Sequence, residues 1–316
     1  MNLAEFIASF DAQPVFQANG KRAPHKALAL LYALGKLSHN QNLTTYSAAE
    51  NELKSLLQTF GPPRRFAHAE QPIWRLRNAA PGHPTIWQIT NEDKIQLVGN
   101  ASSPDPSVPD MRRYLSFGLS PDAVRLFRAD PSLIASTAAY IADSVVPETL
   151  RDELLQAVGI ANSGPAVQAS LAPASMTLTP HAHALVSRRV RDPSFAPRVR
   201  AAYGERCAVC SARPMLGNRL FGLEAAHIRW IQADGPNSVC NGICLCRMHH
   251  VAFDRGAFTI GPDRIVKVSM LLDRSPKSEQ LFWEHHGSKI AEPTRSIDYP
   301  AAEACEWHRR EVFQAE

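Results

Sequence analysis

Cysteine and histidine side chains with the spacing of metal ligands gather in the segment 207–254. A C-x2-C…C-x2-H quartet consists of Cys207, Cys210, Cys246 and His249. Two short pairs separated by a longer stretch are typical of one tetrahedral structural zinc. His249 and His250 are adjacent, so either could be the fourth ligand, and the C-x2-H spacing favours His249. Cys240 and Cys244 are predicted to be small buried residues.

A second set in the same segment has the side chains that metal-assisted hydrolysis of a phosphodiester requires. This set consists of His227, Asn241, His250 and Asp254. A neutral imidazole is best suited to accept a proton from water near pH 7, and we assign that role to His227, at the end of a predicted strand 219–226. His250 and Asp254 are spaced i, i+4, so on a helix they could offer a nitrogen and a carboxylate to one divalent cation. Asn241 suits a turn, where its amide could hold the backbone or orient His227.

This order of residues around the cysteine pairs resembles the HNH (ββα-metal) endonuclease family. The resemblance implies that His227 is the general base, Asn241 the central asparagine and His250 a ligand of a catalytic divalent metal. Many members carry Asp or His directly before the first histidine as a metal ligand, where this chain has Ala226. A further ligand is then expected from Glu224 or from water. The resemblance predicts an enzyme that cuts DNA.

Two other functions are compatible with the same residues. Four Cys and His ligands can form a zinc ribbon without catalysis, so a non-catalytic zinc-ribbon DNA-binding protein is one alternative. An HNH endonuclease directed to methylated or unmodified DNA is the other. The order of His227, Asn241, His250 and Asp254 around the quartet favours a nuclease over a zinc ribbon.

Length and composition indicate a globular protein with two domains. A chain of 316 residues is too long for one ordinary hydrophobic core, and its 45% hydrophobic and 20% charged residues are typical of globular proteins. The first residues lack the pattern of a secretory signal peptide. Clustered cysteines indicate a reducing compartment, so we expect a cytoplasmic protein. The net charge of +4 is compatible with binding to nucleic acid.

The N-terminal half predicts a buried helix with cations at its start. Residues 3–10 follow a helical pattern, and a nearly apolar helix follows Pro24 and runs to about Leu37. Its amino end carries Arg22, His25 and Lys26 together with the positive end of the helix dipole, which suits a phosphate. A solvated basic helix start is the alternative.

Residues 73–77, Ile-Trp-Arg-Leu-Arg, alternate between apolar and basic side chains. We interpret them as a strand with Arg75 and Arg77 on one face, and residues 85–89 as its partner strand. Basic side chains beside an aromatic residue and prolines suggest a face that binds nucleic acid. Arginines that are only exposed to solvent are the alternative.

Two segments in this half, Gly-Lys-Arg-Ala-Pro-His-Lys at 20–26 and Gln-Pro-Ile-Trp-Arg-Leu-Arg at 71–77, carry a second resemblance. With the leucine-rich helix they resemble the sulfur-binding domain of phosphorothioate-dependent, McrA-like type IV restriction endonucleases, over roughly residues 1–160. The resemblance implies recognition of DNA in which sulfur replaces one non-bridging phosphate oxygen. Sulfur is softer and less hydrated than oxygen, so a shallow apolar depression beside cationic side chains can favour sulfur over oxygen.

The candidate residues of this predicted DNA-recognition domain, called the reader below, fall into two groups. Pro72 is the candidate residue that lines this apolar depression, and Ala69 and Gln71 are on the same loop. The family often has an aromatic residue where this chain has Gln71. The residues assigned to flanking phosphates and base edges are Arg22, His25, Lys26, Arg75 and Arg77.

The sequence therefore predicts an α+β protein with three parts. These are a helical DNA-reading domain with a small β-sheet, residues 1–160, a linker, residues 161–185, and a zinc-stabilised ββα-metal domain, residues 186–316. Small residues and prolines mark the linker. A helix at 193–203 is expected before the first cysteine pair, and Arg188, Arg189 and Arg191 before it are predicted to contact phosphates. Ser-Ala-Ala-Glu at 47–50 predicts a capping box.

Together the two resemblances imply a type IV restriction endonuclease that binds phosphorothioate-modified DNA and hydrolyses phosphodiester bonds near the modification. The expected cofactors are structural Zn2+ and catalytic Mg2+ or Mn2+, and the expected partner is double-stranded DNA. One HNH domain nicks one strand, so a homodimer is one way to cut both strands. The sequence contains no P-loop, so ATP-driven translocation is not expected.

Overall fold

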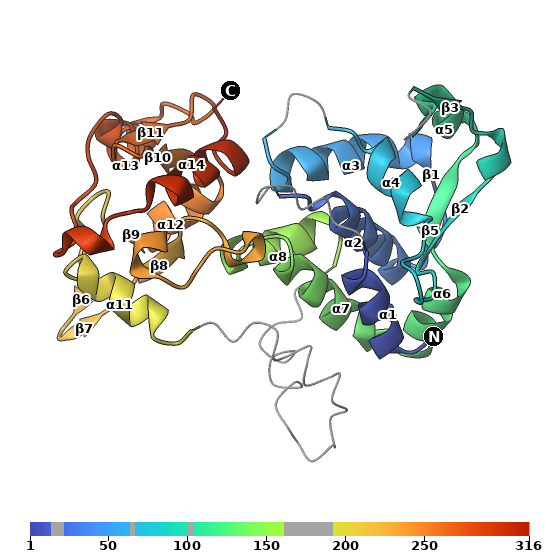
Figure 1. Cartoon of the computed structure of the whole chain (residues 1–316), viewed down its shortest axis with the longest axis horizontal. Coiled ribbons are helices and arrows are strands. Elements are labelled where there is room, and N and C mark those ends of the chain that lie inside the picture. The colour runs from blue at the N-terminus through green and yellow to red at the C-terminus, as the bar shows by residue number, and fades with distance from the viewer. Residues whose placement is uncertain (14–21, 64–66, 100–103, 161–191, 316) are drawn as a thin grey trace, which may run out of the picture. The chain divides into compact units, whose positions relative to one another are not determined.

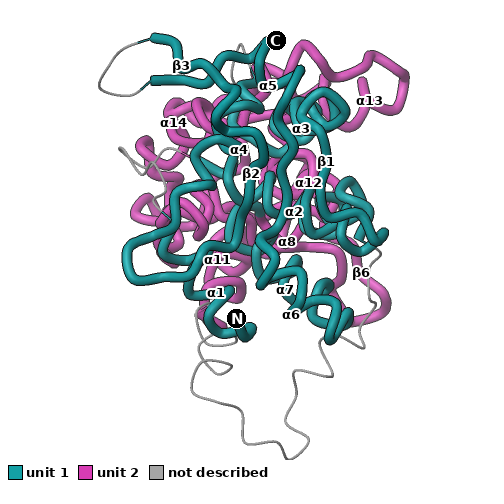
Figure 2. Tube along the Cα trace, turned by 90° about the vertical axis from the view of Figure 1, so that its right-hand side faces the viewer, with its two compact units in different colours: residues 1–17, 23–146, 151–188 teal, residues 18–22, 147–150, 189–316 magenta. Residues whose placement is uncertain are grey.

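A computed structural model describes residues 1–13, 22–63, 67–99, 104–160 and 192–315. The chain forms two compact units, coloured in Figure 2: an N-terminal unit of residues 1–17, 23–146 and 151–188, and a C-terminal unit of residues 18–22, 147–150 and 189–316. The predicted linker, residues 161–185, lies outside the described residues, and the predicted domain boundaries stay a prediction. Within the described ranges, no helix is long and apolar enough to cross a lipid bilayer.

The N-terminal unit is built around α2, His25–Ser38 (Figure 1). Ten of its fourteen residues are buried, because leucines and alanines cover nearly its whole circumference. Gly35 lets the chain after α8 approach this helix, since a Cβ there would lie 1.8 Å from the carbonyl oxygen of Val158. The predicted buried helix is confirmed. The elements that pack on α2 include α3, Tyr46–Phe60, α4, Glu70–Leu76, α7, Ser132–Asp143, and β5, Ser116–Leu119.

A small antiparallel sheet with the order β1-β5-β2 completes the core of this unit. Its outer strands are β1, Thr44–Thr45, and β2, Trp87–Thr90. The rings of Trp87 and Phe117 stack with their centroids 5.5 Å apart, and both are buried. The remaining elements are α1, Leu3–Asp11, η1, Glu92–Lys94, β3, Leu97–Val98, β4, Asp105–Pro106, α5, Val108–Tyr114, α6, Pro121–Ala129, and α8, Glu148–Ala157, whose residues 148–150 belong to the C-terminal unit.

The predicted strand at residues 73–77 is wrong, because this segment belongs to α4. The buried positions Ala69, Pro72, Ile73 and Leu76 follow the spacing i, i+3, i+4, i+7 of a helix. Five residues that alternate are too few to separate a strand from a helix that continues an earlier apolar pattern. The predicted partner strand exists as β2, but it pairs with β5.

The predicted capping box at residues 47–50 is also wrong. α3 begins at Tyr46, with Thr45 as its N-cap residue and no side-chain cap. Glu50 is not at the helix start but one turn inside it, where its carboxylate accepts hydrogen bonds from Arg112 at 2.6 and 2.7 Å. Because the Tyr46 side chain is fully buried, packing determines where this helix begins.

A β-hairpin followed by a helix forms the centre of the C-terminal unit. β8, Leu223–His227, pairs with β9, Gly242–Cys246, so that His227 lies opposite Gly242. Two helices, α12, Arg247–Asp254, and α11, Phe195–Ala202, pack on this hairpin. The predicted ββα arrangement is confirmed. The predicted strand at 219–226 is instead divided, because Gly222 has a φ of +66° between β7 and β8.

The other elements of the C-terminal unit enclose the hairpin and its helix. Most of them share one hydrophobic core with the hairpin and its helix, in which Phe253, Phe258 and Ile243 are almost fully buried. A β-hairpin follows residue 256, and a helix lies near the C-terminus. The elements are β6, Met215–Leu216, β7, Arg219–Leu220, η2, Ile231–Ala233, η3, Val239–Asn241, β10, Phe258–Ile260, β11, Val266–Val268, α13, Pro276–Leu281, η4, Trp283–His285, η5, Ser296–Asp298, and α14, Ala302–Glu311.

Candidate metal centre and nucleic-acid interface

The predicted zinc quartet converges on one point. One ligand atom from each of Cys207, Cys210, Cys246 and His249 lies within 4.8 Å of all the others. The Nδ1 atom of His249 is 3.7 Å from the sulfur of Cys207 and 3.1 Å from that of Cys246. Zinc bond lengths in a tetrahedral site place nitrogen and sulfur ligands about 3.5 Å apart. The four residues therefore fit one tetrahedral zinc ion.

The surroundings of the quartet also suit a metal. The Nε2 atom of His249 lies 2.8 Å from the carbonyl oxygen of Leu281, which orients Nδ1 toward the sulfurs. Contacts with the thiols of Cys210 and Cys246 hold the pKa of the Cys207 thiol below its ordinary value, so that a thiolate is favoured. His249, rather than His250, is the histidine in this cluster.

A second group of polar side chains connects β8 with α12. The imidazole of His250 lies between two carboxylates, with Nδ1 2.7 Å from Glu224 Oε2 and Nε2 3.3 Å from Asp254 Oδ2. Asp254 is 3% exposed and also accepts a hydrogen bond from the hydroxyl of Thr149. These donors are of the types that a hard divalent cation binds. In the described geometry they form a chain with the imidazole in the middle.

The electrostatics of this chain follow from its two carboxylates. Burial lowers the pKa of His250, but the negative charges of Asp254 and Glu224 outweigh it and raise that pKa to about 9. The hydrogen bond from His250 in turn lowers the pKa of Glu224. The two acids therefore favour positive charge between them, whether it is carried by a proton or by a metal ion.

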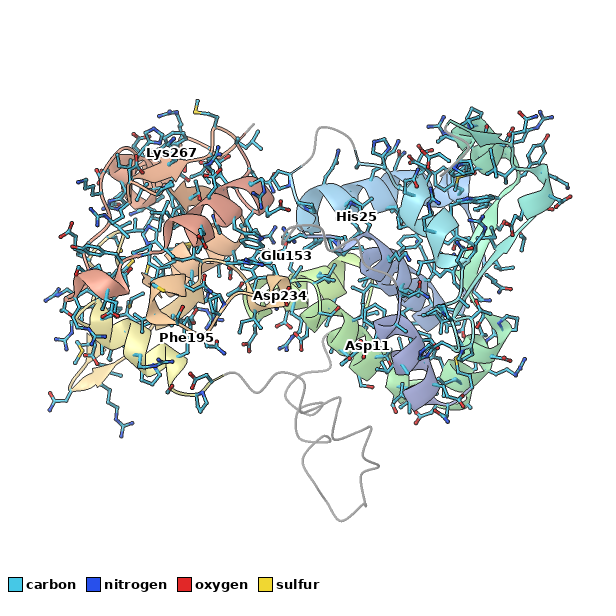
Figure 3. All side chains as sticks on the ribbon, in the orientation of Figure 1. Asp11, His25, Glu153, Phe195, Asp234 and Lys267 are labelled. Carbon is cyan, nitrogen blue, oxygen red and sulfur yellow. The ribbon has the colours of Figure 1, made fainter. Side chains whose placement is uncertain are left out.

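His227 belongs to a third group, on α11 and the loop between β8 and β9. Its ring stacks on Phe195 with the centroids 3.8 Å apart and the planes at 11°. Its Nε2 atom lies 2.9 Å from the side-chain oxygen of Asn237. Figure 3 labels Phe195 at the start of α11, the helix that carries this ring. The imidazole is thus held against an aromatic face and by a carboxamide.

Asn241 holds the backbone of the same loop. Its side-chain oxygen accepts a hydrogen bond from the amide of Arg229, and its side-chain nitrogen donates to the carbonyls of Arg229 and Pro236, all within 3.0 Å. Asn241 is 1% exposed. Of the two roles expected for this residue, its described bonds correspond to holding the backbone. The side chain bonded to His227 is Asn237, four residues earlier.

The alternation of β8 explains why Glu224 reaches His250. Neighbouring residues of a strand face opposite sides, so Glu224 and Ala226 share the side that faces α12. His227 is on the other side, against Phe195. Glu224 therefore presents a carboxylate on the side where Ala226 lacks a ligand. The described contacts therefore place His227 and His250 on opposite sides of β8, with His227 as the last residue of the strand.

In the N-terminal unit, Lys26 and Arg75 form a basic pair at the start of α2 and on α4. Burial and the charge of Arg75 lower the pKa of Lys26. The guanidinium of Arg75 donates a hydrogen bond to the side-chain oxygen of Gln71 at 3.4 Å and forms an ion pair with the carboxylate of Asp105 at 3.1 Å. His25 and Gln71 lie beside them, partly exposed, and Pro72 is buried. The structure therefore brings together Lys26, Gln71, Pro72 and Arg75 from two distant segments.

Three residues assigned to the same face have other surroundings. Ala69 has no exposed surface, because it continues the buried side of α4. It therefore packs beneath the candidate site and does not line a depression on the surface. Arg77 stacks 3.9 Å from the ring centroid of Trp74 and pairs with Glu92. Arg22 belongs to the C-terminal unit.

In the C-terminal unit, Arg22 contacts an aromatic ring and a backbone carbonyl. Its guanidinium lies 4.1 Å from the ring centroid of Trp230 and donates to the carbonyl of Glu311 at 3.0 Å. The predicted phosphate contacts Arg188, Arg189 and Arg191 lie outside the described residues.

Sequence reasoning missed Asn237 and Phe195. Phe195 is in the expected helix at 193–203, but no sequence pattern indicates that its ring lies on His227. Asn237 follows Pro236 in a loop, and only the folded path of that loop brings its side chain to the imidazole.

Comparisons with known proteins identify both parts of the chain. The family of ScoMcrA-like DNA sulfur-binding domains matches residues 3–163, and the HNH endonuclease family matches residues 207–261. No curated protein matches the chain.

Three solved structures of restriction proteins match parts of this chain. The sulfur-binding domain of ScoMcrA complexed with phosphorothioated DNA is 20% identical, with a TM-score of 0.35 over 43% of this chain and 83% of that one. The modification-dependent restriction endonuclease TagI is 24% identical, with a TM-score of 0.29 over 38% of each chain.

The type IV phosphorothioation-dependent restriction endonuclease ScoMcrA is 20% identical, with a TM-score of 0.40 over 51% of this chain and 28% of that one. The present chain thus spans less than a third of the length of ScoMcrA. Since residues 3–163 are just over half of the 316 residues, the protein belongs to the family of ScoMcrA-like DNA sulfur-binding domain proteins and carries an HNH endonuclease domain after that domain.

Proposed function

We propose that this protein is a type IV restriction endonuclease that binds phosphorothioate-modified DNA and hydrolyses phosphodiester bonds near the modification. One observation carries the proposal: a sulfur-binding domain match over residues 3–163 and an HNH endonuclease match over residues 207–261 occur in the same chain. The first supplies a reader of modified DNA and the second a domain that cuts DNA.

The reader is proposed to use the pair of cations beside Pro72. Burial and, to a smaller extent, the charge of Arg75 lower the pKa of Lys26, and an anionic phosphate placed between the two cations would offset both effects. His25 and Lys26 occupy the first turn of α2, where backbone N–H groups favour a phosphate. The stem of Gln71, which is partly exposed and is supported by the buried Pro72 beside it, is the apolar surface that we assign to the sulfur atom, which is less strongly hydrated than oxygen.

Zn2+ is the ion proposed for Cys207, Cys210, Cys246 and His249, since three thiols and one imidazole nitrogen are its common structural ligands. These residues connect the chain after α11 to β9 and α12. Holding them together fixes the helix that carries His250 against the hairpin that carries His227. The site is structural in this proposal, because all four ligands come from the protein.

His227 is proposed to accept a proton from the attacking water. Phe195 covers one face of its ring and Asn237 bonds one of its nitrogens, so the imidazole is oriented before the substrate arrives. Glu224 and Nδ1 of His250 would hold Mg2+ or Mn2+, which when bound offsets negative charge on the phosphate, and Asp254 would orient His250 by accepting a hydrogen bond from its Nε2–H. Asn241 keeps the loop between the strands in place. Because one HNH domain nicks one strand, we propose that two copies act together in a double-strand break.

Plasmid cleavage tests this function. We expect full-length zinc-loaded protein with Mg2+ or Mn2+ to cut phosphorothioate-modified plasmid and to leave the unmodified plasmid of the same sequence intact. His227→Ala is expected to abolish cutting while binding to modified DNA is retained. Equal cutting of both plasmids would point to a different reader. Binding without any cutting by the native protein would favour the non-catalytic zinc ribbon.

A further inference from the structure

The loop between β8 and β9 presents one side chain to the candidate general base. The side-chain oxygen of Asn237 lies 2.9 Å from Nε2 of His227. This bond joins a residue of the loop to the last residue of β8. The structure therefore raises the question of what Asn237 contributes to the imidazole.

The backbone around Asn237 is fixed from two directions. On one side, Asn241 donates a hydrogen bond to the carbonyl of Pro236 at 2.9 Å. On the other side, the guanidinium of Arg198 on α11 donates to the carbonyl of Asn237 itself at 3.0 Å, and it also pairs with Asp192 at 2.8 Å. The Asn237 carboxamide is thus placed before any substrate binds.

The turn before Asn237 is also closely packed. The amide of Gly235 donates to the carbonyl of Trp230 at 2.9 Å, and a Cβ at Gly235 would lie 1.8 Å from the carbonyl oxygen of Arg229. Because a side chain cannot occupy that position without moving backbone, the path of the loop is determined by its own contacts. The bond from Asn237 to His227 is an addition to a loop that Asn241 already holds.

A neutral imidazole carries its proton on one nitrogen and accepts a proton with the other. When Nε2–H donates to a carbonyl oxygen, Nδ1 is the nitrogen without a proton, and the ring is ready to act as a base through Nδ1. We infer that Asn237 is a positioning residue, whose side-chain oxygen accepts the Nε2–H bond and so selects the tautomer and orientation in which His227 takes a proton from water. This inference rests on the proposed function, because it assigns the base of that reaction.

Two substitutions separate this role from a purely structural one. Asn237→Ala removes the acceptor, and we expect the single-turnover cleavage rate to fall about 10- to 100-fold, as for other outer partners of catalytic groups. DNA affinity and thermal stability are expected to stay close to those of the native protein. Asn237→Asp keeps an acceptor oxygen in the same place and should restore the tautomer.

The aspartate variant adds a readout that a structural role would not move. A carboxylate beside the ring favours the protonated imidazole, so the acid limb of the pH–rate profile should move to higher pH by about one unit or more, with the rate recovering at alkaline pH. The control is Asn218→Ala, at an exposed turn in the same unit. All variants keep the charged and titratable groups of β8, of the elements packed on it and of the loop. These groups are Arg198, Arg200, Glu224, Arg229, Asp234, Cys240, Cys244, Cys246, Arg247, His249, His250 and Asp254.

The outcomes are distinct. An Asn237→Asp variant as slow as Asn237→Ala at every pH would overturn the inference, because it would mean that the amide N–H faces the ring. Native cleavage by Asn237→Ala would also overturn it. Nitrogen NMR of the histidine rings in the full-length zinc-loaded protein reads the tautomer without any reaction: a proton on Nε2 of His227 supports the inference, and one on Nδ1 contradicts it. If the native protein shows the expected tautomer but cuts no DNA, the proposed function fails and the tautomer assignment stands.

Discussion

Gly242 lies opposite His227 in the hairpin and has no room for a side chain. A Cβ at this position would be 2.4 Å from Cγ2 of Val199 and 3.0 Å from Cζ of Phe195. Carbon atoms in contact are about 3.5 Å apart or more, so Gly242→Ala must move Val199 or the strand by about 1 Å. Overpacking of this kind costs about 1–3 kcal/mol of unfolding free energy.

The same substitution should affect catalysis through Phe195. Its ring stacks on His227, so a displaced Phe195 shifts the imidazole from its place. A misplacement of about 1 Å can lower a rate by about 100-fold. We therefore expect Gly242→Ala to reduce single-turnover cleavage of phosphorothioate DNA by about that factor. Affinity for the modified DNA should not change, because the sulfur-binding domain match ends at residue 163.

A compensating substitution provides the control. Val199→Ala removes the Cγ2 atom that lies nearest to the new Cβ, so the double variant should cut faster than Gly242→Ala and be less destabilised than the two single effects added together. Denaturant unfolding and quenched cleavage time courses measure the two quantities. If Gly242→Ala cuts and unfolds like the native protein, the packing argument for the orientation of His227 is wrong.

Three further predictions address the zinc site, the N-terminal core and the reader. Cys207→Ser should release zinc and unfold the C-terminal unit, because structural zinc binding supplies folding free energy; a folded, zinc-free variant by circular dichroism and metal analysis would contradict this. Hydrogen bonds from Arg112 lower the pKa of Glu50 to about 2, so its ion pairs contribute stability above pH 4.5 that is lost as the pH falls toward 2. The stability difference between the native protein and Glu50→Gln, from unfolding curves at several pH values, should shrink over that range, and a constant difference would refute it. Pro72→Asp should weaken the preference for sulfur more than general DNA binding in paired binding assays, and an unchanged preference would remove Pro72 from the site.

The sequence predicts those parts of the site that are encoded by short spacings. The zinc quartet needs only the intervals C-x2-C and C-x2-H, and its ligand atoms do converge. His250 and Asp254 share a helix face because they are one turn apart. Glu224 could be foreseen as a neighbour of His250 only in part, since its reach depends on the pairing of β8 with β9 and the placement of α12.

Other features depend on the tertiary path and were not predictable. Asn237 meets His227 because a loop folds back, held by Asn241 and Arg198. Arg77 has a cationic side chain typical of a nucleic-acid face, yet it stacks on Trp74 and pairs with Glu92. Residues 73–77 taken alone predict a strand where the structure has the helix α4, because the apolar pattern of that helix begins earlier, at Ala69.

The central claim is that the N-terminal unit selects DNA by one sulfur atom and the HNH domain cuts it with His227. The most direct measurement uses two duplexes of the same sequence that differ only in one non-bridging atom, sulfur or oxygen, incubated with the full-length protein or with His227→Ala. The account predicts strand cleavage of the sulfur duplex by the native protein alone, and tighter binding of that duplex by both proteins. Equal binding of the two duplexes, or cleavage that survives His227→Ala, would contradict it.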